Sequence, residues 1–255
     1  MTDAPVLIAT EGATLIITIN RPAARNAIDR ATTLAIAEAI DTLETDDRLR
    51  VGILTGAGDH FCAGMDLKAF LKGERVEIEG RGLAGLTERP PRKPLIAAVE
   101  GYALAGGFEI ALACDMTVAS QTAMFGIPEV RRGLIAGSGG LLRLPQRIPR
   151  QIALEYALTG NLMDAATAHR WGLINRLTER GGALDAARAL AAEVTANAPL
   201  AVVATKQIMA SAHNWPAQDV WPRQNAILEA VIASDDATEG ARAFAEKRKP
   251  DWSGR

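Results

Sequence analysis

The stretch Ile96–Asp115, IAAVEGYALAGGFEIALACD, decides how this chain folds. Its first residues belong to an apolar, β-prone run from Leu95 to Val99, and Phe108 to Ala113 have the composition of a buried helix. Between these two segments the side chains become small, at Gly101, Ala103, Ala105, Gly106 and Gly107. The pattern predicts a strand, a tight glycine turn and the N-terminus of a helix.

Such a turn leaves backbone N–H groups unpaired at the helix N-terminus, where the helix dipole is positive. Glycine at positions 106 and 107 lets a ligand approach this backbone closely. The turn would therefore suit an anion, or an oxyanion that develops during a reaction. Glu109 follows in an otherwise apolar segment. From this stretch alone, its carboxylate is either a partner of the helix dipole or a catalytic group.

Length and composition limit the class of protein. The chain has 255 residues, enough for one large domain or for a domain with an appendage. Aromatic residues make up only 4%, so the core must be built from Ala, Leu, Ile and Val. The net charge of −2 gives no support for nucleic-acid binding. No apolar run approaches the roughly 20 residues that span a bilayer, so we expect no membrane partner.

Cysteine and histidine are scarce. Cys62 and Cys114 are too few for a disulfide framework, and the N-terminus lacks the features of a signal peptide. We therefore expect a cytoplasmic protein. The three histidines, His60, His169 and His213, show no metal-ligand spacing with the cysteines, so no metal site is expected.

Short strands and helices alternate along the first part of the chain, which predicts an α/β fold with crossover helices. We expect strands over residues 6–9, 14–19, 51–55, 95–99, 115–119 and 123–125 and after residue 175, and helices over residues 29–44, 150–158 and 164–171. The charged stretch 71–93 predicts a mobile loop with a weak helix, which would serve as a lid or a binding wall.

From Gly182 onward only helical patterns occur, over residues 184–197, 200–212, 221–234 and 237–247. We therefore place a boundary near residue 195. A strand–helix core would occupy residues 1–195, and an all-helical appendage would occupy residues 196–255.

A second strand–turn–helix unit lies at Phe61–Leu67, FCAGMDL. Asp66 near the helix start is, taken alone, most simply a helix cap. The alternative is functional, because the turn would expose a second set of N–H groups at Ala63 and its neighbours.

The glycine-rich run at residues 133–140 is not a nucleotide fingerprint, because Gly137–Leu142 lacks the third glycine of G-x-G-x-x-G. Residues 136–140 resemble a nucleophile elbow, with His169 or His213 as the base, but the first position is alanine and the preceding strand is doubtful. A serine hydrolase is therefore a weak alternative. We expect His60, His169 and His213 to be surface or helix-face residues.

Two carboxylates stand out because their surroundings are apolar and rich in glycine: Glu109, and Glu129 in a predicted loop. Two carboxyl groups in a partly desolvated site can hold different protonation states, so that one acts as an acid and the other as a base. With backbone N–H groups at Ala63 and Gly106, the parts of an acid–base site with an oxyanion hole are present. Spacing alone does not show that these residues converge.

The chain resembles the crotonase family, the enoyl-CoA hydratase/isomerase superfamily, in stretches that follow the family's order over nearly the whole length. These stretches are Asn20–Pro22 with Asn26–Ala27, Phe61–Leu67, Ala98–Glu109, Cys114–Asp115, Phe125–Glu129, Gly133–Leu144, Trp171–Asn175 and Phe244–Arg248. The run from Gly133 to Ile148 is also similar to carnitinyl-CoA dehydratase-like members.

The resemblance implies a crotonase-like spiral of ββα units that forms two roughly perpendicular sheets. Residues 1–195 would bind acyl-CoA and carry the catalytic groups, and residues 196–255 would be a helical trimerisation region. The protein would be a homotrimer, or a hexamer made as a dimer of trimers. The substrate would be an acyl-CoA thioester of fatty acid metabolism, with no metal and no cofactor beyond the coenzyme A of the substrate.

By motif position, the resemblance assigns an oxyanion hole to the N–H groups of Ala63 and Gly106, and the two hydratase glutamates to Glu109 and Glu129. The coenzyme A contacts that it implies are Arg25, Ala63, Gly64, Met65, Asp66, Leu67, Lys68 and Gly106, with Lys247 reaching the site in the oligomer.

We therefore expect an enoyl-CoA hydratase, which adds water across the 2,3 double bond of a trans-2-enoyl-CoA. The alternatives are a carnitinyl-CoA-type dehydratase, an enoyl-CoA isomerase, and a non-catalytic acyl-CoA-binding protein. Phe108, Met65 and Ala136 depart from residues common in the family. Phe108 either packs in the core, which we favour, or narrows the acyl pocket.

Overall fold

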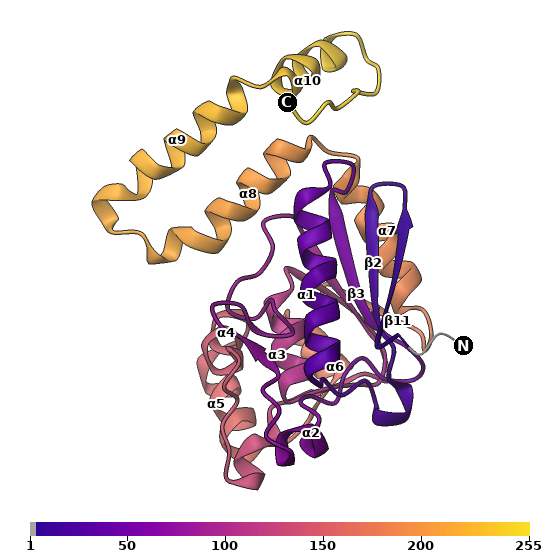
Figure 1. The fold of residues 1–255 in the computed structure, drawn as a ribbon. Helices are drawn as coiled ribbons and strands as arrows, with labels where there is room; N and C mark the ends of the chain where they lie inside the picture. The colour runs from indigo at the N-terminus through magenta and orange to yellow at the C-terminus, as the bar shows by residue number, and fades with distance from the viewer. Residues whose placement is uncertain (1–3) are drawn as a thin grey trace.

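A six-stranded sheet forms the centre of the computed structural model, which describes residues 4–255 (Figure 1). Our expectation about a signal peptide rests partly on residues 1–3, which lie outside the described residues. The strands are β1 (Val6–Glu11), β2 (Thr14–Ile19), β3 (Val51–Gly56), β6 (Leu95–Val99), β8 (Met116–Ser120) and β11 (Arg176–Thr178), in the order β1-β2-β3-β6-β8-β11. Only β1 pairs antiparallel in this sheet; the other pairs are parallel. The predicted crossover connections are confirmed, and β1 and β2 form an antiparallel hairpin.

Helices cover both faces of this sheet. Leu15 and Ile17 of β2 belong to one buried cluster with residues of α1 (Arg30–Thr45). Ile16, between them in sequence, belongs to a second cluster with residues of α7 (Ala183–Thr195). Because side chains alternate across a strand, the two helices lie on opposite faces. Burial on both faces explains why the parallel strands are apolar at nearly every position.

A second sheet of three short strands lies beside the first, in the order β10 (Met163–Asp164), β9 (Met124–Gly126), β7 (Tyr102–Leu104). The predicted glycine turn after β6 therefore contains a strand, β7, before α3 (Gly106–Ala113) begins. Ala103 in β7 is fully buried and opposite Phe125 of β9, so the small side chains in this stretch serve close packing as well as turning.

The stretch 71–93 differs from its prediction. After α2 (Leu67–Leu71) it holds no further helix, and instead β4 (Glu77–Ile78) and β5 (Gly82–Leu83) form an antiparallel hairpin. Gly73, Gly80, Gly82 and Gly85 all have positive φ, which a helix does not allow. Val76 and Leu83 are buried and pin the hairpin to the body.

Two of the remaining helices of the body, α5 (Arg150–Thr159) and α6 (Ala165–Arg170), are close to their predicted positions. The sequence analysis placed no helix at α4 (Gly140–Arg147) or at the short 3₁₀ helices η1 (Pro22–Ala24) and η2 (Pro128–Arg132). Glu129 therefore lies in a 3₁₀ helix and not in the predicted loop. Pro128 at the start and Gly133 at the left-handed end, φ 69°, explain this short helix.

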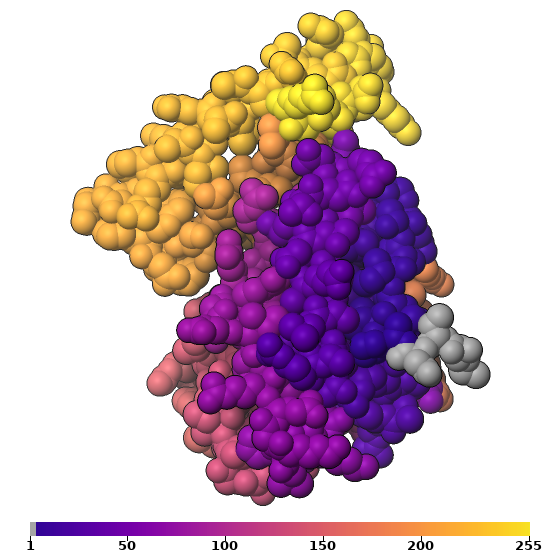
Figure 2. Space-filling model, in the orientation of Figure 1, coloured from indigo at the N-terminus to yellow at the C-terminus, as the bar shows by residue number. Residues whose placement is uncertain are grey.

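The C-terminal helices leave the body after α7, and they project from it in Figures 1 and 2. They are α8 (Pro199–Ser211), η3 (Ala212–Asn214), η4 (Ala217–Asp219), α9 (Val220–Ile232) and α10 (Asp235–Ala245). Lys206 of α8 ties this tail to the body through Asp115 of the body, at 2.6 Å between Nζ and Oδ2. Large apolar side chains of the tail face outward, and Phe244 is 87% exposed.

Candidate active site

A cavity of about 420 Å³ lies beside the start of α3. Both candidate carboxylates, Glu109 and Glu129, line it. Its other walls come from α2, the β4–β5 hairpin and the loop after η2, and include Arg25, Ala63, Met65, Leu67, Phe70, Val76, Glu77, Leu83, Glu88, Leu104, Gly106, Arg132, Leu134, Ile135 and Ser138. The structure thus brings together most of the residues that the sequence singled out, and it makes part of the 71–93 stretch a wall of the cavity.

The backbone at the start of α3 is held in an unusual conformation. Ala105 has φ 52° and ψ −129°, a region that costs a non-glycine residue energy and that clusters at functional sites. Its N–H donates to the Gly126 carbonyl, and its own carbonyl accepts from Phe108 and Glu109. The next N–H, of Gly106, donates to no residue in the range 4–255. A Cβ at Gly106 would lie 2.5 Å from a methyl group of Leu83, so a larger residue here would require this buried leucine to shift.

The second donor of the predicted oxyanion hole is displaced by two residues. The N–H of Ala63 donates to the Arg25 carbonyl at 3.0 Å, so it is not free for a ligand. The N–H of Met65 has no acceptor among the described residues, and it lies 3.6 Å from the point that a Cβ on Gly106 would occupy. Met65 and Gly106 therefore form the pair of free donors, and Ala63 contributes only to the cavity wall.

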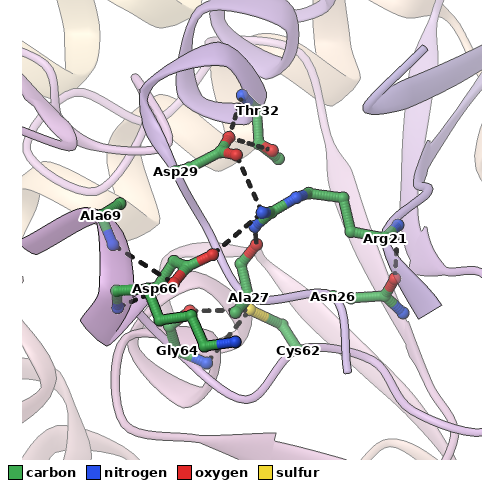
Figure 3. A network of polar contacts seen from close by, with 10 residues as sticks. Arg21, Asn26, Ala27, Asp29, Thr32, Cys62, Gly64, Asp66 and Ala69 are labelled. Atoms are coloured by element: carbon green, nitrogen blue, oxygen red, sulfur yellow. Dashed lines mark hydrogen bonds and ion pairs between the residues drawn. The ribbon is translucent and has the colours of Figure 1, made fainter. Parts of the chain in front are cut away.

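Figure 3 shows the network of polar contacts around Gly64 and Asp66, the two residues that flank Met65 in the chain. Arg21 Nη2 lies 2.9 Å from carboxylate oxygens of both Asp29 and Asp66. Asp66 also accepts from the N–H of Lys68 at 2.9 Å and of Ala69, at the start of α2. The cap interpretation of Asp66 is confirmed. Burial raises its pKa, but Arg21 and these two N–H groups together hold the pKa below its usual range.

The Glu109 carboxylate is anchored on one side only. Its Oε1 accepts from the N–H groups of Ser138 and Gly140, both at 2.8 Å, and Oε2 accepts from no described residue. The side chain is buried, with the residue only 3% exposed. Burial raises its pKa, while the two N–H groups and the Arg143 guanidinium act in the opposite direction. The glycine-rich run thus holds a carboxylate, a role that the sequence analysis missed.

Glu129 has a different environment. Its Oε2 is buried and has no hydrogen-bond partner among the described residues. Burial raises its pKa, and the charge of Glu109 raises it further. A buried carboxyl oxygen without a donor favours the protonated form. The cavity therefore joins a carboxyl group that accepts two N–H groups and a second one whose pKa is raised both by burial and by the charge of the first.

The predicted coenzyme A contacts separate into two groups. Arg25 and Leu67 line the cavity, and the Arg25 guanidinium lies 5.9 Å from the centre of the Tyr102 ring. Lys68 is exposed on α2 beside it. Lys247 follows α10, which Figure 1 places at the far end of the tail from α2 and α3, so within one chain it does not reach the cavity.

Gly64 has a structural role in this chain. Its φ of +99° and a distance of 2.9 Å from its would-be Cβ to the Cβ of Ala105 leave room for glycine alone. Its carbonyl accepts from Ile28.

Phe108 points away from the cavity. It is 2% exposed and packs against Phe125, with ring centres 5.5 Å apart. The core interpretation is confirmed, and the large side chains that line the cavity instead include Met65, Phe70 and Leu83.

The histidines give no support to a serine hydrolase. His169 Nδ1 lies 3.1 Å from the Ile174 carbonyl, and His213 belongs to η3 of the tail. His60 is not a simple surface residue, because its ring stacks on Tyr102 at 4.5 Å. Within residues 4–255 no three His, Cys, Asp or Glu side chains gather as a metal site would require, and no helix combines the length and hydropathy needed to cross a bilayer.

Comparisons with known proteins show the family of this chain. The family described as enoyl-CoA hydratase/isomerase matches residues 9–255. A carnitinyl-CoA dehydratase from Proteus mirabilis is 44% identical over 256 residues, covering 97% of this chain and 98% of the relative. An enoyl-CoA hydratase structure from Mycobacterium marinum has a TM-score of 0.98 and 58% identity, covering 99% of this chain and 100% of that one. A carnitinyl-CoA hydratase structure from Mycobacterium avium has a TM-score of 0.80 and 43% identity, covering 100% of both.

Proposed function

Because the chain belongs to the enoyl-CoA hydratase/isomerase family, we propose that it is an enoyl-CoA hydratase, which reversibly adds water to the 2,3 double bond of a trans-2-enoyl-CoA. The observation that carries this proposal is the meeting of two glutamates and two free backbone N–H groups at one cavity. The crotonase fold and hydratase-type chemistry are features of the family; the particular reaction is the proposal.

The thioester carbonyl would bind between the N–H groups of Met65 and Gly106. As water attacks C3, the carbonyl oxygen gains negative charge in an enolate, and both donors stabilise that charge. Preorganised donors of this kind need no reorganisation during the reaction, and loss of one costs on the order of 10² to 10³ in rate. The positive φ of Ala105 and the narrow fit at Gly106 support this role, since both fix the direction of the donor before substrate arrives.

The two carboxyl groups would divide the proton transfers. Glu109, ionised and held through Oε1, presents Oε2 to the water and takes its proton as the C3–O bond forms. Glu129, protonated, gives its proton to C2 as the enolate collapses. The two transfers leave the pair with one proton between them, and exchange with bulk water restores the starting arrangement. The opposed environments of the two groups support this assignment.

Arg25, which lines the cavity, and Lys68, which is exposed next to the cavity-lining Leu67, are candidates for binding the phosphates of coenzyme A. Lys247 joins the same site only if the tail of another subunit covers it, which agrees with the proposed homotrimer or hexamer. The exposed apolar faces of α8 and α9 support such an assembly, because faces of this kind are usually buried against a neighbour.

The deciding assay follows loss of the enoyl-thioester absorbance of crotonyl-CoA and of longer trans-2-enoyl-CoAs. The proposal predicts hydration by the wild-type protein and severe loss of turnover in Glu129→Gln, with acyl-CoA binding retained. Acyl-CoA binding by the wild-type protein without hydration of any enoyl-CoA would identify a non-catalytic binder instead.

A carnitinyl-CoA-type dehydratase is the second candidate, because the curated relatives carry that name. One structural feature favours it. Glu77 and Glu88 line the cavity, and neither carboxylate forms an ion pair with a described residue. Together with the Phe70 ring, they would suit a quaternary ammonium group on the acyl chain. A higher kcat/KM for dehydration of carnitinyl-CoA than for hydration of crotonyl-CoA, reduced in a Glu77→Gln/Glu88→Gln variant, would decide for this candidate.

A further inference from the structure

Arg143 of α4 reaches across the glycine-rich turn that precedes its helix. Its Nη2 donates to the Thr87 carbonyl at 2.6 Å. Its Nη1 lies 2.1 Å from the point that a Cβ on Gly139 would occupy, so the guanidinium lies directly against the backbone there. Gly139 also has φ +97°, a conformation suited to glycine. The guanidinium therefore occupies the space in which a side chain at position 139 would lie.

The same turn holds the candidate base from its other side. The N–H groups of Ser138 and Gly140, on either side of Gly139, both donate to Glu109 Oε1. A Cβ on Gly140 would lie 2.9 Å from Glu109 Cγ. The turn thus lies between the Arg143 guanidinium and the Glu109 carboxylate, and a shift of the turn would move both N–H donors.

Thr87 connects this arrangement to the substrate. It follows the β4–β5 hairpin, its hydroxyl is buried against Gly82, and the next residue, Glu88, lines the cavity. The bond from Arg143 to Thr87 therefore joins the turn behind Glu109 to the wall that would contact the acyl chain.

We propose that Arg143 is a positioning residue for Glu109, which clamps the Ser138–Gly140 turn onto that carboxylate and ties the turn to the cavity wall at Thr87. This inference rests on the proposed function insofar as Glu109 is the base. Arg143 touches neither substrate nor reacting atoms in this arrangement, and it acts through the turn and through its charge.

The charge of Arg143 acts in the same direction as its geometry. Two charged groups face Glu109, Arg143 on α4 and Glu129 on η2. The positive charge of Arg143 favours the ionised form of Glu109, and a negative charge on Glu129 would oppose it. Arg143 itself faces Arg147 and Cys114 in addition to Glu109, and burial lowers its pKa. Removal of the guanidinium would therefore favour the protonated, inactive form of Glu109.

The test compares Arg143→Gln with Arg147→Gln. Arg147 lies one turn later on α4, and its guanidinium also donates to backbone carbonyls, those of Leu112 and Cys114. The two variants lose the same charge from the same helix, but only Arg143 holds the turn. We expect Arg143→Gln to lower kcat for enoyl-CoA hydration by roughly 10- to 100-fold with little change in KM, as for a small displacement of a catalytic group. We also expect its acidic limb of kcat/KM to move to higher pH.

Arg147→Gln should leave the acidic limb of kcat/KM at its wild-type pH. Arg143→Lys keeps the charge, so its acidic limb should lie close to that of wild type, while its kcat should remain below the wild-type value. Equal effects of both glutamine variants on melting temperature and kcat, with an unmoved limb, would overturn the proposal. If Arg143→Gln fails to fold, Arg143→Lys gives the test. An Arg143→Lys variant with the kcat of wild type and the same acidic limb of kcat/KM would also overturn the proposal.

A readout without turnover separates this inference from the proposed function. The carboxyl carbon of Glu109, observed by NMR in glutamate-labelled protein and assigned with Glu109→Gln, reports its pKa directly. A Glu109 pKa that is higher in Arg143→Gln than in wild type, but unchanged in Arg147→Gln, supports the inference even if the wild-type protein hydrates no enoyl-CoA. Hydration by wild type together with an unchanged Glu109 titration and kcat in Arg143→Gln would refute the inference alone.

Discussion

Replacement of Glu109 by glutamine should separate catalysis from stability. Glu109 Oε1 accepts two N–H groups at 2.8 Å, and a glutamine can keep both by placing its amide oxygen at that position. Its NH₂ group would then face the cavity, where it cannot accept a proton from water. Because general bases contribute roughly 10² to 10⁴-fold, we expect kcat to fall by that factor, about 3 to 5 kcal/mol of activation free energy.

The same variant should be more stable than wild type at neutral pH, although its kcat is lower. Burial raises the pKa of Glu109 in the folded protein, so the ionised carboxylate is less favourable in the fold than in the unfolded chain. The contribution of Glu109 to the free energy of unfolding is therefore lost as pH rises from its unfolded pKa through its folded pKa. Glutamine does not ionise, so the melting temperature of Glu109→Gln should match wild type in acid and exceed it at neutral pH.

Glu109→Ala is the matched control. Alanine removes the acceptor of the Ser138 and Gly140 N–H groups, and each buried donor left unpaired costs about 1 to 3 kcal/mol. This variant should lose both turnover and melting temperature. The measurements are crotonyl-CoA hydration and thermal unfolding between pH 4 and pH 8. A Glu109→Gln variant with near-wild-type turnover, or one less stable than Glu109→Ala, would refute this account of the site.

Three further outcomes follow from the structure. Gly106→Ala would place a Cβ 2.5 Å from Leu83 and beside the Met65 N–H. We therefore expect kcat for enoyl-CoA hydration to fall by on the order of 10² to 10³. A turnover within tenfold of wild type would exclude Gly106 from the oxyanion hole. Phe108→Ala removes a buried ring and should lower the free energy of unfolding by about 3 to 5 kcal/mol, while the order of preference among enoyl-CoAs of different length and branching stays the same. Light scattering at micromolar concentration should give the mass of a trimer or a hexamer, and a stable monomer would contradict the proposed oligomer.

Much of the main sheet could be predicted from the sequence, because its strands are apolar runs and its helices keep regular spacing. The short elements could not. Tyr102–Leu104 forms β7 only because β9, about 20 residues later, pairs with it, and the surrounding glycines and alanines indicate a turn when considered alone. The β4–β5 hairpin was missed for a related reason, since each of its strands has only two residues and no alternation can be seen.

The oxyanion hole illustrates a limit of motif position. In an extended segment, the N–H groups of residues 63 and 65 lie on the same side of the chain. Which of them is free depends on the partner strand, and here the Arg25 carbonyl takes the N–H of Ala63. That pairing joins residues 38 positions apart, so the local sequence carries no sign of it. The proposed oxyanion hole therefore uses the free N–H of Met65 in place of Ala63, together with that of Gly106.

The glycine-rich run at 137–140 was hardest to interpret, because its meaning lies in its backbone. Glycine runs suggest phosphate or nucleophile turns when they are read for ligands. Here the N–H groups of Ser138 and Gly140 donate to a carboxylate of the same chain, about 30 residues earlier. N–H donors of this kind favour the ionised form of a buried carboxyl group, and Glu129 in the same cavity has a buried Oε2 without a donor among the described residues. The difference between the two glutamates, and with it the proposed division into base and acid, thus depends on two backbone N–H groups of this turn.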